Sequence, residues 1–354
     1  MEFITEYGLF LAKSITVIAT FVIILGVMFS YSQKARGHDR GHFEITRLNE
    51  KFESVEDTFK EAILEPEVLK LQRKEEEKQH KAEAKAKKKA LKQAHEAAEA
   101  VLKSRVFVLN FDGDLKASAV DNLREEISCI LSQANANDEV IVRLESGGGM
   151  VHSYGLAASQ LDRIKKKQIP LTICVDKVAA SGGYMMACVA DKILAAPFAV
   201  LGSIGVIAQL PNFHRLLKKN YIDFEMITAG EHKRTLTMFG ENTEKGREKF
   251  AEDLQDTHEL FKSFVAAHRP VVDLAEVANG DVWFGQRALE KSLVDELMTS
   301  DEYIHTRATT ADVFEVEFIQ KKTLQEKLGM AAEAAADRLL LTWLARARNS
   351  RFFF

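Results

Sequence analysis

From Arg105 onward, short apolar runs alternate with segments of helical spacing, and this alternation is what most constrains the fold. The runs VFVLNF at 106–111 and VIVRL at 140–144 are bounded by turn residues, as strands are. Residues 118–134 repeat Val, Leu and Ile at intervals of three and four, which predicts a helix. Strands that alternate with helices form a largely parallel sheet, because a parallel pair needs a long crossover connection. We therefore predict an α/β domain over residues 105–330.

The same reasoning extends along the domain. Further strands are expected at 171–175, 191–195 and 224–228, and further helices at 153–166, 184–189 and 243–268. Hydrophobic residues make up 46% of the chain and charged residues 28%, which is ordinary for a globular protein and argues against wholesale disorder.

Residues 14–33 contain no charged side chain. As a helix rising about 1.5 Å per residue this run is about 30 Å long, the thickness of a bilayer core. Lys13 and Lys34 flank it and can reach the two interfaces. A cleaved signal peptide would have a shorter apolar region and an Ala-x-Ala-like site, which only Ser30-Tyr31-Ser32 loosely resembles. We predict an uncleaved transmembrane anchor within residues 1–35.

Residues 36–104 form the next segment, which is rich in charge. Between Lys70 and Lys92 there are ten Lys or Arg and four Glu, with no Gly or Pro, so helix is favoured. We expect a charged helical or flexible spacer, with attraction to anionic lipid headgroups as the alternative. The absence of interleaved aromatic residues and the overall net charge of −4 argue against nucleic acid as a partner.

Cysteine usage excludes two classes of protein. The three cysteines, Cys129, Cys174 and Cys188, are too few for a disulfide framework and lie in apolar stretches, so we expect buried thiols. No Cys or His spacing is typical of a zinc site, and we predict neither a metal nor a cofactor.

Two glycine-rich turns at strand ends carry the candidate catalytic groups. Ser181 follows a predicted strand and precedes Gly182 and Gly183 at the start of an apolar helix, where a nucleophilic serine would sit on a sharp turn. The turn at 147–149 could supply a second backbone N–H for an oxyanion. Each turn has a plain alternative, since a serine that caps a helix and a glycine turn are both common.

A nucleophilic serine needs a base. A lysine can act as one if it is neutral, which burial favours. Lys233 follows the predicted strand 224–228 and the Gly230 turn, but its charged neighbours also suit a surface lysine. No histidine lies in a recognisable partner motif, although folding could bring one close; the candidates are His152, His214, His232, His258 and His268.

Four motifs in order give the chain a resemblance to the signal peptide peptidase family of serine proteases. DKVAASGGY at 176–184 looks like that family's serine motif, and GSIGVI at 202–207 resembles its second serine motif. TAGEHK at 228–233 resembles the lysine motif, 52 residues from Ser181 to Lys233. The closing segment NGDVWFG at 279–285, with Leu293-Val294-Asp295 after it, is also similar. The anchor and spacer look most like an inner-membrane protease branch of Gram-negative bacteria.

The resemblance implies a ClpP/crotonase-like fold of repeated ββα units and a Ser/Lys dyad. Ser181 would be the nucleophile, Lys233 the general base, and Ser203 the hydroxyl that orients Lys233. The oxyanion hole would use the N–H groups of Gly182 and Gly149, with Gly148 as the alternative to Gly149. Where the family commonly has Asn-Ser-Pro-Gly-Gly, this chain has Glu-Ser-Gly-Gly-Gly at 145–149, so the turn is less rigid.

The resemblance also implies a homo-oligomer, a ring or dome, that cuts peptide or protein substrates. An amphipathic helix is predicted within residues 331–354, docked on a neighbouring subunit or on the membrane. Two other functions remain open at this point. One is a non-catalytic membrane scaffold on the same fold, and the other is a crotonase-like acyl-CoA enzyme.

The side of the membrane is contested. Lys34, Arg36, Arg40 and Arg47 follow the anchor while only Lys13 precedes it, which by the positive-inside rule places the catalytic domain in the cytoplasm. The family's digestion of membrane-derived peptides favours the periplasm, and we expect a single-pass inner-membrane protein with a periplasmic domain.

Overall fold

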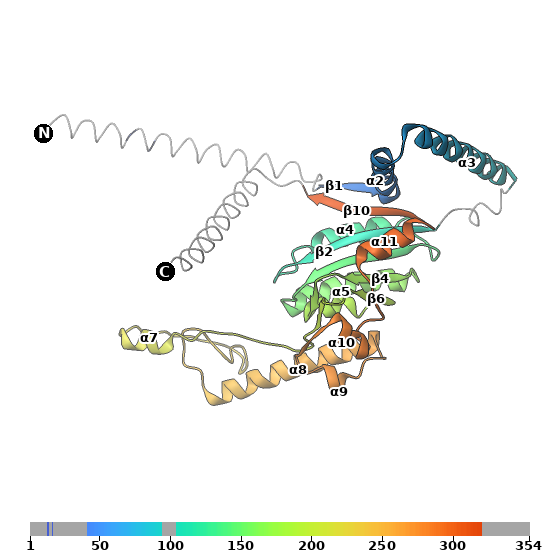
Figure 1. The fold of residues 1–354 in the computed structure, drawn as a ribbon. Helices are drawn as coiled ribbons and strands as arrows, with labels where there is room; N and C mark the ends of the chain where they lie inside the picture. Colours follow the sequence, from blue (N-terminus) through green and yellow to red (C-terminus); the bar gives the residue numbers. More distant parts are fainter. Residues whose placement is uncertain (1–12, 14–15, 17–40, 94–103, 321–354) are drawn as a thin grey trace, which may run out of the picture. The chain divides into compact units, whose positions relative to one another are not determined.

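The computed structural model describes residues 41–93 and 104–320, together with Lys13 and Thr16. Residues 44–317 form one unit, which holds every site residue discussed below. Its helices are α2 Leu48–Ile63, α3 Pro66–Gln93, α4 Val120–Leu131, α5 Val151–Lys166, α6 Gly182–Ala187, α7 His214–Lys219, α8 Glu244–His268, α9 Leu274–Val277, α10 Gly285–Glu290 and α11 Ser300–Ala308. The strands are β1 Gly41–Arg47, β2 Arg105–Gly113, β3 Glu139–Ser146, β4 Leu171–Val175, β5 Val178–Ala180, β6 Lys192–Ala195, β7 Val200–Gly202, β8 Val282–Phe284, β9 Glu296–Leu297 and β10 Asp312–Gln320 (Figure 1).

The sheet is mostly parallel, as the alternation of strands and helices predicted. Its main path runs β1-β10-β2-β3-β4-β6-β9, and a branch runs from β3 through β5 and β7 to β8. Parallel pairing joins β10 to β2, β2 to β3, β3 to β4, β4 to β6 and β6 to β9. Only the pairing of β7 with β8 is antiparallel among those whose register is resolved.

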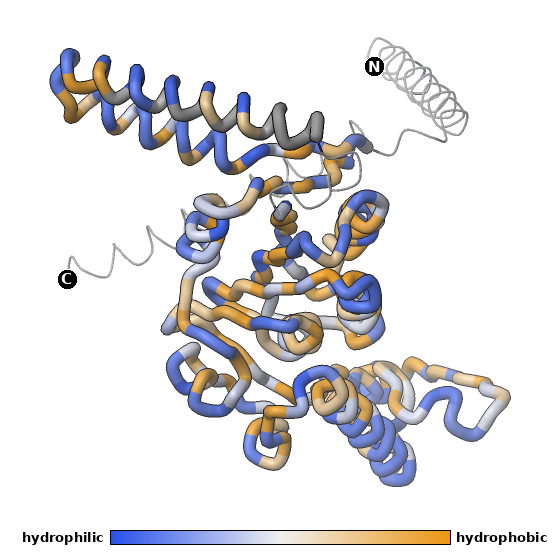
Figure 2. Tube along the Cα trace, turned by 90° about the vertical axis from the view of Figure 1, so that its right-hand side faces the viewer, coloured by the Kyte–Doolittle hydropathy of each residue, from blue (hydrophilic) through white to orange (hydrophobic). Residues whose placement is uncertain are grey.

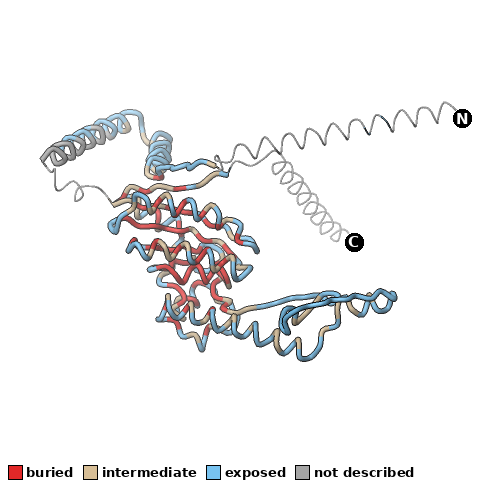
Figure 3. The backbone as a smooth tube through the Cα atoms, turned by 180° about the vertical axis from the view of Figure 1, so that it is seen from behind, coloured by how far each residue is buried: buried red, intermediate tan, exposed pale blue. Residues whose placement is uncertain are grey.

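Alternate side chains of the central strands enter two different cores. In β3, Val140, Val142 and Leu144 pack with α4, α5 and α6, whereas Ile141 packs on the opposite face with Leu48 of α2 and Ile304 of α11. This follows from the two-residue repeat of a strand, which turns successive side chains to opposite faces. Figure 3 shows the buried residues concentrated in these strands and in the helices that cover them. The sheet is therefore covered by helices on both faces.

Most of the predicted elements occur where the sequence placed them. The strand at 171–175 is confirmed as β4, and the helix expected at 243–268 is α8. The strand expected at 224–228 is wrong, because these residues form neither helix nor strand in the structure. A strand needs a neighbour to satisfy its backbone groups, and no described strand pairs with this segment.

The segment 205–243, here called the arm, connects β7 to α8 and contains α7 as its one helix. Hydrophobic and hydrophilic stretches alternate along it (Figure 2), yet nearly all of it is exposed (Figure 3). The exposed fractions of three of its apolar residues are 78% for Ile207, 97% for Tyr221 and 95% for Ile227. The arm therefore carries apolar surface that the described part of one chain leaves uncovered.

The first part of the charged spacer is attached to the domain. The Asn49 side chain donates hydrogen bonds to the carbonyl oxygens of Ala308 and Ala311, 3.0 Å in each case. One apolar stripe runs along α2 at helical spacing. Leu48 at its start is 3% exposed, whereas Phe59 near its end is 67% exposed. The helix thus begins in the core and ends outside it.

Among the described residues, no helix combines the length and hydropathy needed to cross a bilayer. Apart from Thr16, the predicted anchor at 14–33 lies outside those residues, and so does the amphipathic helix predicted within 331–354.

Candidate active site

Four loops meet at one edge of the sheet because the strands they join are neighbours. Ser146 of β3 pairs with Ala179 of β5, and Ala180 of β5 pairs with Gly202 of β7. On the other side of β7, Gly202 pairs with Val282 of β8. The glycine turn 147–149, the two serine turns and the loop before β8 therefore follow one another across the sheet.

This register places the two candidate serines at equivalent positions. Ser181 is the residue after Ala180, and Ser203 is the residue after Gly202. Because neighbouring strands lie about 4.8 Å apart, the two residues lie side by side. The backbone N–H of Ser181 donates to the carbonyl oxygen of Gly202 at 2.8 Å, which holds the two turns together.

Ser181 adopts a backbone conformation that few residues other than glycine tolerate, with φ 52° and ψ −117°. It immediately precedes α6, and its carbonyl oxygen accepts the N–H of Met185 at 2.9 Å. A serine on so sharp a strand-to-helix turn projects its hydroxyl out of the fold, and Ser181 is indeed partly exposed. Strain of this kind is concentrated at functional sites.

Ser203 also has a positive φ, 50°, which residues other than glycine rarely adopt. Its N–H donates to the carbonyl oxygen of Asp281 at 2.6 Å, so the loop before β8 fixes the turn. The side chain is partly exposed, as that of Ser181 is.

The glycine turn lies against the Ser181 turn so closely that it excludes side chains. A Cβ atom on Gly148 would lie 2.7 Å from the backbone nitrogen of Gly182 and 2.8 Å from the Cβ of Ser181. Gly148 also has a φ of +87°, which suits glycine alone. Glycine is therefore required at position 148 for two reasons, the backbone conformation and the close approach of the Ser181 turn.

Hydrogen bonding distinguishes the candidate oxyanion donors. The N–H of Gly148 already donates to the Ser146 hydroxyl at 3.0 Å. For the N–H groups of Gly149 and Gly182 we find no acceptor within the described part of the chain. An oxyanion hole requires two such N–H groups beside the serine; Gly149 borders the same cavity as Ser181, whereas Gly182 is buried at the start of α6.

A buried tyrosine, Tyr154, supports both the glycine turn and the Ser181 turn from the protein interior. The Tyr154 hydroxyl donates to the carbonyl oxygen of Asp114 at 2.8 Å and lies 2.6 Å from the Ser146 hydroxyl. Since its proton goes to Asp114, Tyr154 accepts from Ser146, whose oxygen in turn accepts the Gly148 N–H. A Cβ on Gly182 would approach the Tyr154 ring to 2.4 Å, so the ring also packs under the second turn. Burial raises the pKa of Tyr154, which keeps this hydroxyl protonated.

The turns line a cavity of about 750 Å³. Ser181, Ser203, Gly148 and Gly149 all border it, and Gly182, which is buried, does not. Apolar side chains form much of its wall, namely Leu115, Met150, Val206 and Ile207. The wall beside the two serines is therefore largely apolar.

Lys233 is not part of this cavity in the described chain. It lies on the arm, exposed, in a turn where its N–H donates to the carbonyl oxygen of Gly230 at 3.2 Å. The structure thus brings together the two serines and the glycine turn but leaves the predicted base apart. The titratable side chain that does border the cavity is His258 of α8.

Comparison with known proteins identifies the family. The Peptidase family S49 N-terminal model matches residues 2–161, and the Peptidase family S49 model matches residues 163–314. "Probable protease SohB" of Haemophilus influenzae is 50% identical over 339 residues, which are 96% of each chain. The chain belongs to peptidase family S49. The resemblance to the signal peptide peptidase family is thereby confirmed, and the chain is a peptidase.

A second relative gives the same answer. "Probable protease SohB" of Buchnera aphidicola subsp. Acyrthosiphon pisum is 49% identical over 330 residues, covering 92% of this chain and 93% of that protein. Both of these relatives are named as probable proteases of the SohB type. Among solved structures, a membrane-bound stomatin-specific protease with a substrate peptide aligns at a TM-score of 0.37 and 14% identity, covering 64% of this chain and 96% of that one. That likeness is too weak to bear on the chemistry.

The closing motif of this S49 peptidase divides into two parts. Asn279 and Gly280 border the cavity, and Asp281 accepts the Ser203 N–H. Asp295 instead forms a two-point ion pair with the buried Arg269, at 2.9 and 3.1 Å, far along the chain from the serines. The first part therefore builds the site and the second holds the fold.

Sequence reasoning missed Tyr154 and the cavity position of His258. Tyr154 reads as one more apolar residue in a helix, and its spacing of eight residues from Ser146 carries no known motif. His258 was one of five candidate histidines, and only the fold places it at the cavity. Neither could be found without the sheet register.

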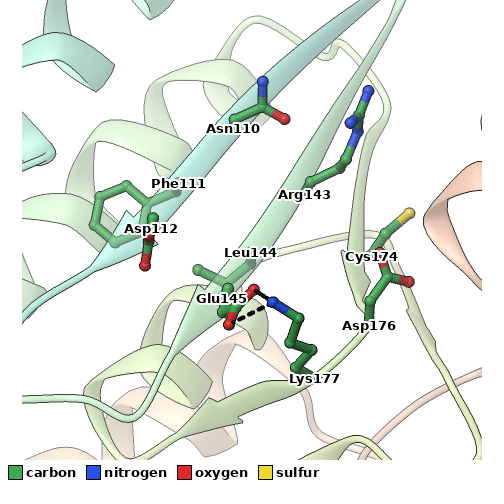
Figure 4. Close-up of a pocket in the computed structure, with 9 residues that line it drawn as sticks. All are labelled: Asn110, Phe111, Asp112, Arg143, Leu144, Glu145, Cys174, Asp176 and Lys177. Carbon is green, nitrogen blue, oxygen red and sulfur yellow. Dashed lines mark hydrogen bonds and ion pairs between the residues drawn. The ribbon is translucent and has the colours of Figure 1, made fainter. Parts of the chain in front are cut away.

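A second cavity, of about 290 Å³, lies at the ends of β2, β3 and β4 (Figure 4). Lys177 points across it to Glu145, and the two form an ion pair at 2.8 Å. Neither serine borders this cavity. Two of its other charged residues bond partners outside the lining, Arg143 to Glu315 and Asp176 to Ser300, and the cavity lacks the serine and glycine turns of the first one.

Cysteine chemistry is not part of the S49 site. Burial raises the pKa of Cys174 to about 12, assisted by the carboxylates of Asp176 and Glu139, and burial raises that of Cys188 to about 12 as well. Thiols held protonated in this way are poor nucleophiles. Within the described residues, no group of three or more His, Cys, Asp or Glu side chains could hold a metal ion.

Proposed function

We propose that this S49 peptidase is a serine endopeptidase in which Ser181 is the nucleophile and Lys233 the general base. The observation that carries the proposal is the strained turn of Ser181, paired in register with Ser203 and adjoining two available N–H groups. Membership of a peptidase family favours this function over the acyl-CoA enzyme and the scaffold. The wider ClpP/crotonase-like fold is part of the same proposal.

The proposed reaction is acyl transfer through Ser181. The Ser181 oxygen attacks the peptide carbonyl carbon as its proton passes to the neutral Lys233 amine, and the carbonyl oxygen becomes an anion. The N–H groups of Gly182 and Gly149 donate to that anion, while Gly148, whose N–H is occupied by Ser146, fixes the turn. Collapse breaks the peptide bond as Lys233 returns the proton to the leaving amine. Water then repeats the sequence on the acyl-enzyme, which releases the acid and restores Ser181.

The position of Lys233 has a structural implication. A lysine can act as a general base only as the neutral amine, which a site that excludes water favours, so we expect Lys233 to enter such a site. The arm that carries it exposes apolar side chains throughout. We propose that a second copy of the chain covers this surface and that the arm of one copy places Lys233 at Ser181 of its neighbour. Ser203, beside Ser181, would then hydrogen-bond the incoming amine.

The cellular setting completes the proposal. Residues 14–33 would anchor the enzyme in the bacterial inner membrane with the catalytic domain in the periplasm, as a ring or dome of identical subunits. Substrates would be peptides with apolar side chains, such as remnants of signal peptides or segments of misfolded membrane or envelope proteins. The apolar wall of the cavity supports that choice.

A fluorophosphonate probe tests the nucleophile directly. Full-length wild-type protein should become labelled and lose peptidase activity, and Ser181→Ala should do neither. Ser132→Ala is a matched control, because Ser132 is exposed and hydrogen-bonds only the Cys129 carbonyl oxygen after α4. If Ser181→Ala keeps more than a few per cent of the wild-type rate, Ser181 is not the nucleophile.

A further inference from the structure

The cavity holds an imidazole that the proposed reaction does not use. His258 lies on α8, and its Nε2 atom is 3.1 Å from the carbonyl oxygen of Ile204. Ile204 is the residue after Ser203 and is fully buried. His258 itself is only partly buried and borders the same cavity as both serines.

The hydrogen bond determines which proton the ring carries. A carbonyl oxygen only accepts, so Nε2 must be the donor, and in a neutral ring Nδ1 then carries no proton. An Nε2 that donates to Ile204 cannot at the same time take the proton of a serine. The contact therefore gives the ring a structural task near the reacting groups, and any proton transfer by this ring would use Nδ1.

The task is defined by what surrounds Ser203. The backbone N–H of Ser203 donates to the Asp281 carbonyl oxygen at 2.6 Å. The carbonyl oxygen of the next residue, Ile204, accepts from the His258 ring. Ser203 has a φ of 50°, a conformation that persists only where the surroundings over-determine it. The two hydrogen bonds flank the strained residue and come from separate elements, the loop before β8 and helix α8.

We infer that His258 is a positioning residue, which holds the Ser203 turn in the conformation that presents its hydroxyl to the base. The inference rests on the proposed function for its catalytic consequence, but the positioning itself concerns only the turn. His258 would thus affect the rate through Ser203 and would not exchange protons with the substrate.

Two substitutions at this position separate positioning from proton transfer. His258→Gln keeps an amide N–H at a similar reach and should retain the peptidase rate within about threefold. His258→Ala loses the donor and should lower kcat by about ten- to a hundredfold with little change in KM, because substrate binding does not use the bond. The peptidase rate of His258→Gln should also depend on pH in the same way as that of the wild type.

A neighbouring histidine supplies the control. His268 lies on the same helix and also contacts a backbone carbonyl, that of Phe264 at 2.9 Å through Nδ1, but it is outside the cavity. His268→Ala should leave kcat unchanged. If it lowers kcat as much as His258→Ala does, the effect belongs to the helix and the inference fails.

Amide hydrogen exchange gives a readout independent of activity. Peptides covering residues 200–206 should exchange about tenfold faster in His258→Ala than in the wild type, and at the wild-type rate in His258→Gln and His268→Ala. An inactive Ser181→Gly or Ser181→Ala protein can be used for the same measurement. The positioning of the turn is thereby tested even if the Ser/Lys mechanism is wrong.

Two results would overturn the inference. A His258→Gln protein as inactive as His258→Ala, with normal exchange in the turn, would make the ring a participant in proton transfer. A His258→Ala protein with full activity and unchanged exchange would reduce the contact to packing.

Discussion

Ser181 and Ser203 share a left-handed backbone conformation at the ends of two paired strands, and each must be held there by its neighbours. Replacing Ser181 by glycine removes the steric strain together with the nucleophile, whereas alanine removes only the nucleophile. We expect both variants to be inactive. Ser181→Gly should be more stable than Ser181→Ala by about 1–3 kcal/mol, the usual cost of such strain.

Chemical unfolding of the two variants, followed by circular dichroism, measures this difference. Equal stabilities would mean that the surroundings relax around residue 181 and that the turn stores no strain. A stable but active Ser181→Gly protein would contradict the assignment of the nucleophile.

Tyr154 connects two groups under the turns, the Asp114 carbonyl oxygen and the Ser146 hydroxyl. Tyr154→Phe should destabilise the protein by about 1–3 kcal/mol, because the buried Ser146 hydroxyl and the Asp114 carbonyl oxygen lose their partner. It should also lower kcat, since Ser146 orients Gly148. Tyr184→Phe is the matched control, because that buried hydroxyl donates to the Leu293 carbonyl oxygen instead.

Urea unfolding and steady-state kinetics on both tyrosine variants distinguish stability from catalysis. We expect similar losses of stability and a loss of kcat for Tyr154→Phe alone. Equal effects on kcat would show that the network under the turns does not contribute to catalysis.

At the scale of elements, helix α2 has an apolar stripe that is buried at its N-terminal end and exposed at its C-terminal end. Leu48→Ala should cost about 2–5 kcal/mol, as deletion of a buried leucine side chain does. Phe59→Ala on the same stripe should change stability by less than about 0.5 kcal/mol, because Phe59 is 67% exposed. Thermal unfolding of a chain lacking the anchor but retaining residues 41–354 makes the comparison; a large effect of Phe59→Ala would mean that something covers it.

The central elements could be predicted from sequence because their signals are local. The apolar run at 171–175 is buried on both faces and became β4 with unchanged bounds. The expected strand at 224–228 also has large apolar residues, but no described strand pairs with it, and partners are set by the fold rather than by the segment. The attachment of α2 escaped prediction for the same reason, since Asn49 binds carbonyl groups about 260 residues away.

The candidate site was predictable only as far as its turns. Ser181, Ser203 and the glycines lie in motifs of contiguous residues, so the sequence locates them without the fold. The division of work among Gly148, Gly149 and Gly182 depends on which N–H is already bonded, and that requires the Ser146 contact. The roles of all six predicted residues remain predictions until the variants are measured.

At the scale of the whole molecule, Lys233 lies apart from the cavity of its own chain. This separation predicts how two inactive variants behave when their subunits assemble together. Chains carrying Ser181→Ala retain Lys233, and chains carrying Lys233→Ala retain Ser181. If one copy completes the site of another, co-expression of the two inactive variants should restore activity, up to about a quarter of the wild-type level for random pairing of identical subunits. Peptidase assays on the purified mixed assembly provide the measurement.

The controls for this experiment use the same proteins alone. Each variant by itself should be inactive. Lys233→Arg should be as inactive as Lys233→Ala, because arginine stays charged and cannot accept the serine proton. No recovery in a mixed assembly that is confirmed by mass spectrometry would mean that each chain uses its own Lys233.

The exposed arm has a consequence for how much of this enzyme a cell can safely hold. If a second copy supplies the base as proposed, a newly made and scarce enzyme would not cut, because single copies would lack a general base. If residues 14–33 anchor the enzyme as proposed, confinement to the membrane plane would make encounters frequent once synthesis continues. Activity would then rise more steeply than abundance, so that a modest change in expression acts as a threshold and no separate inhibitor or propeptide is needed.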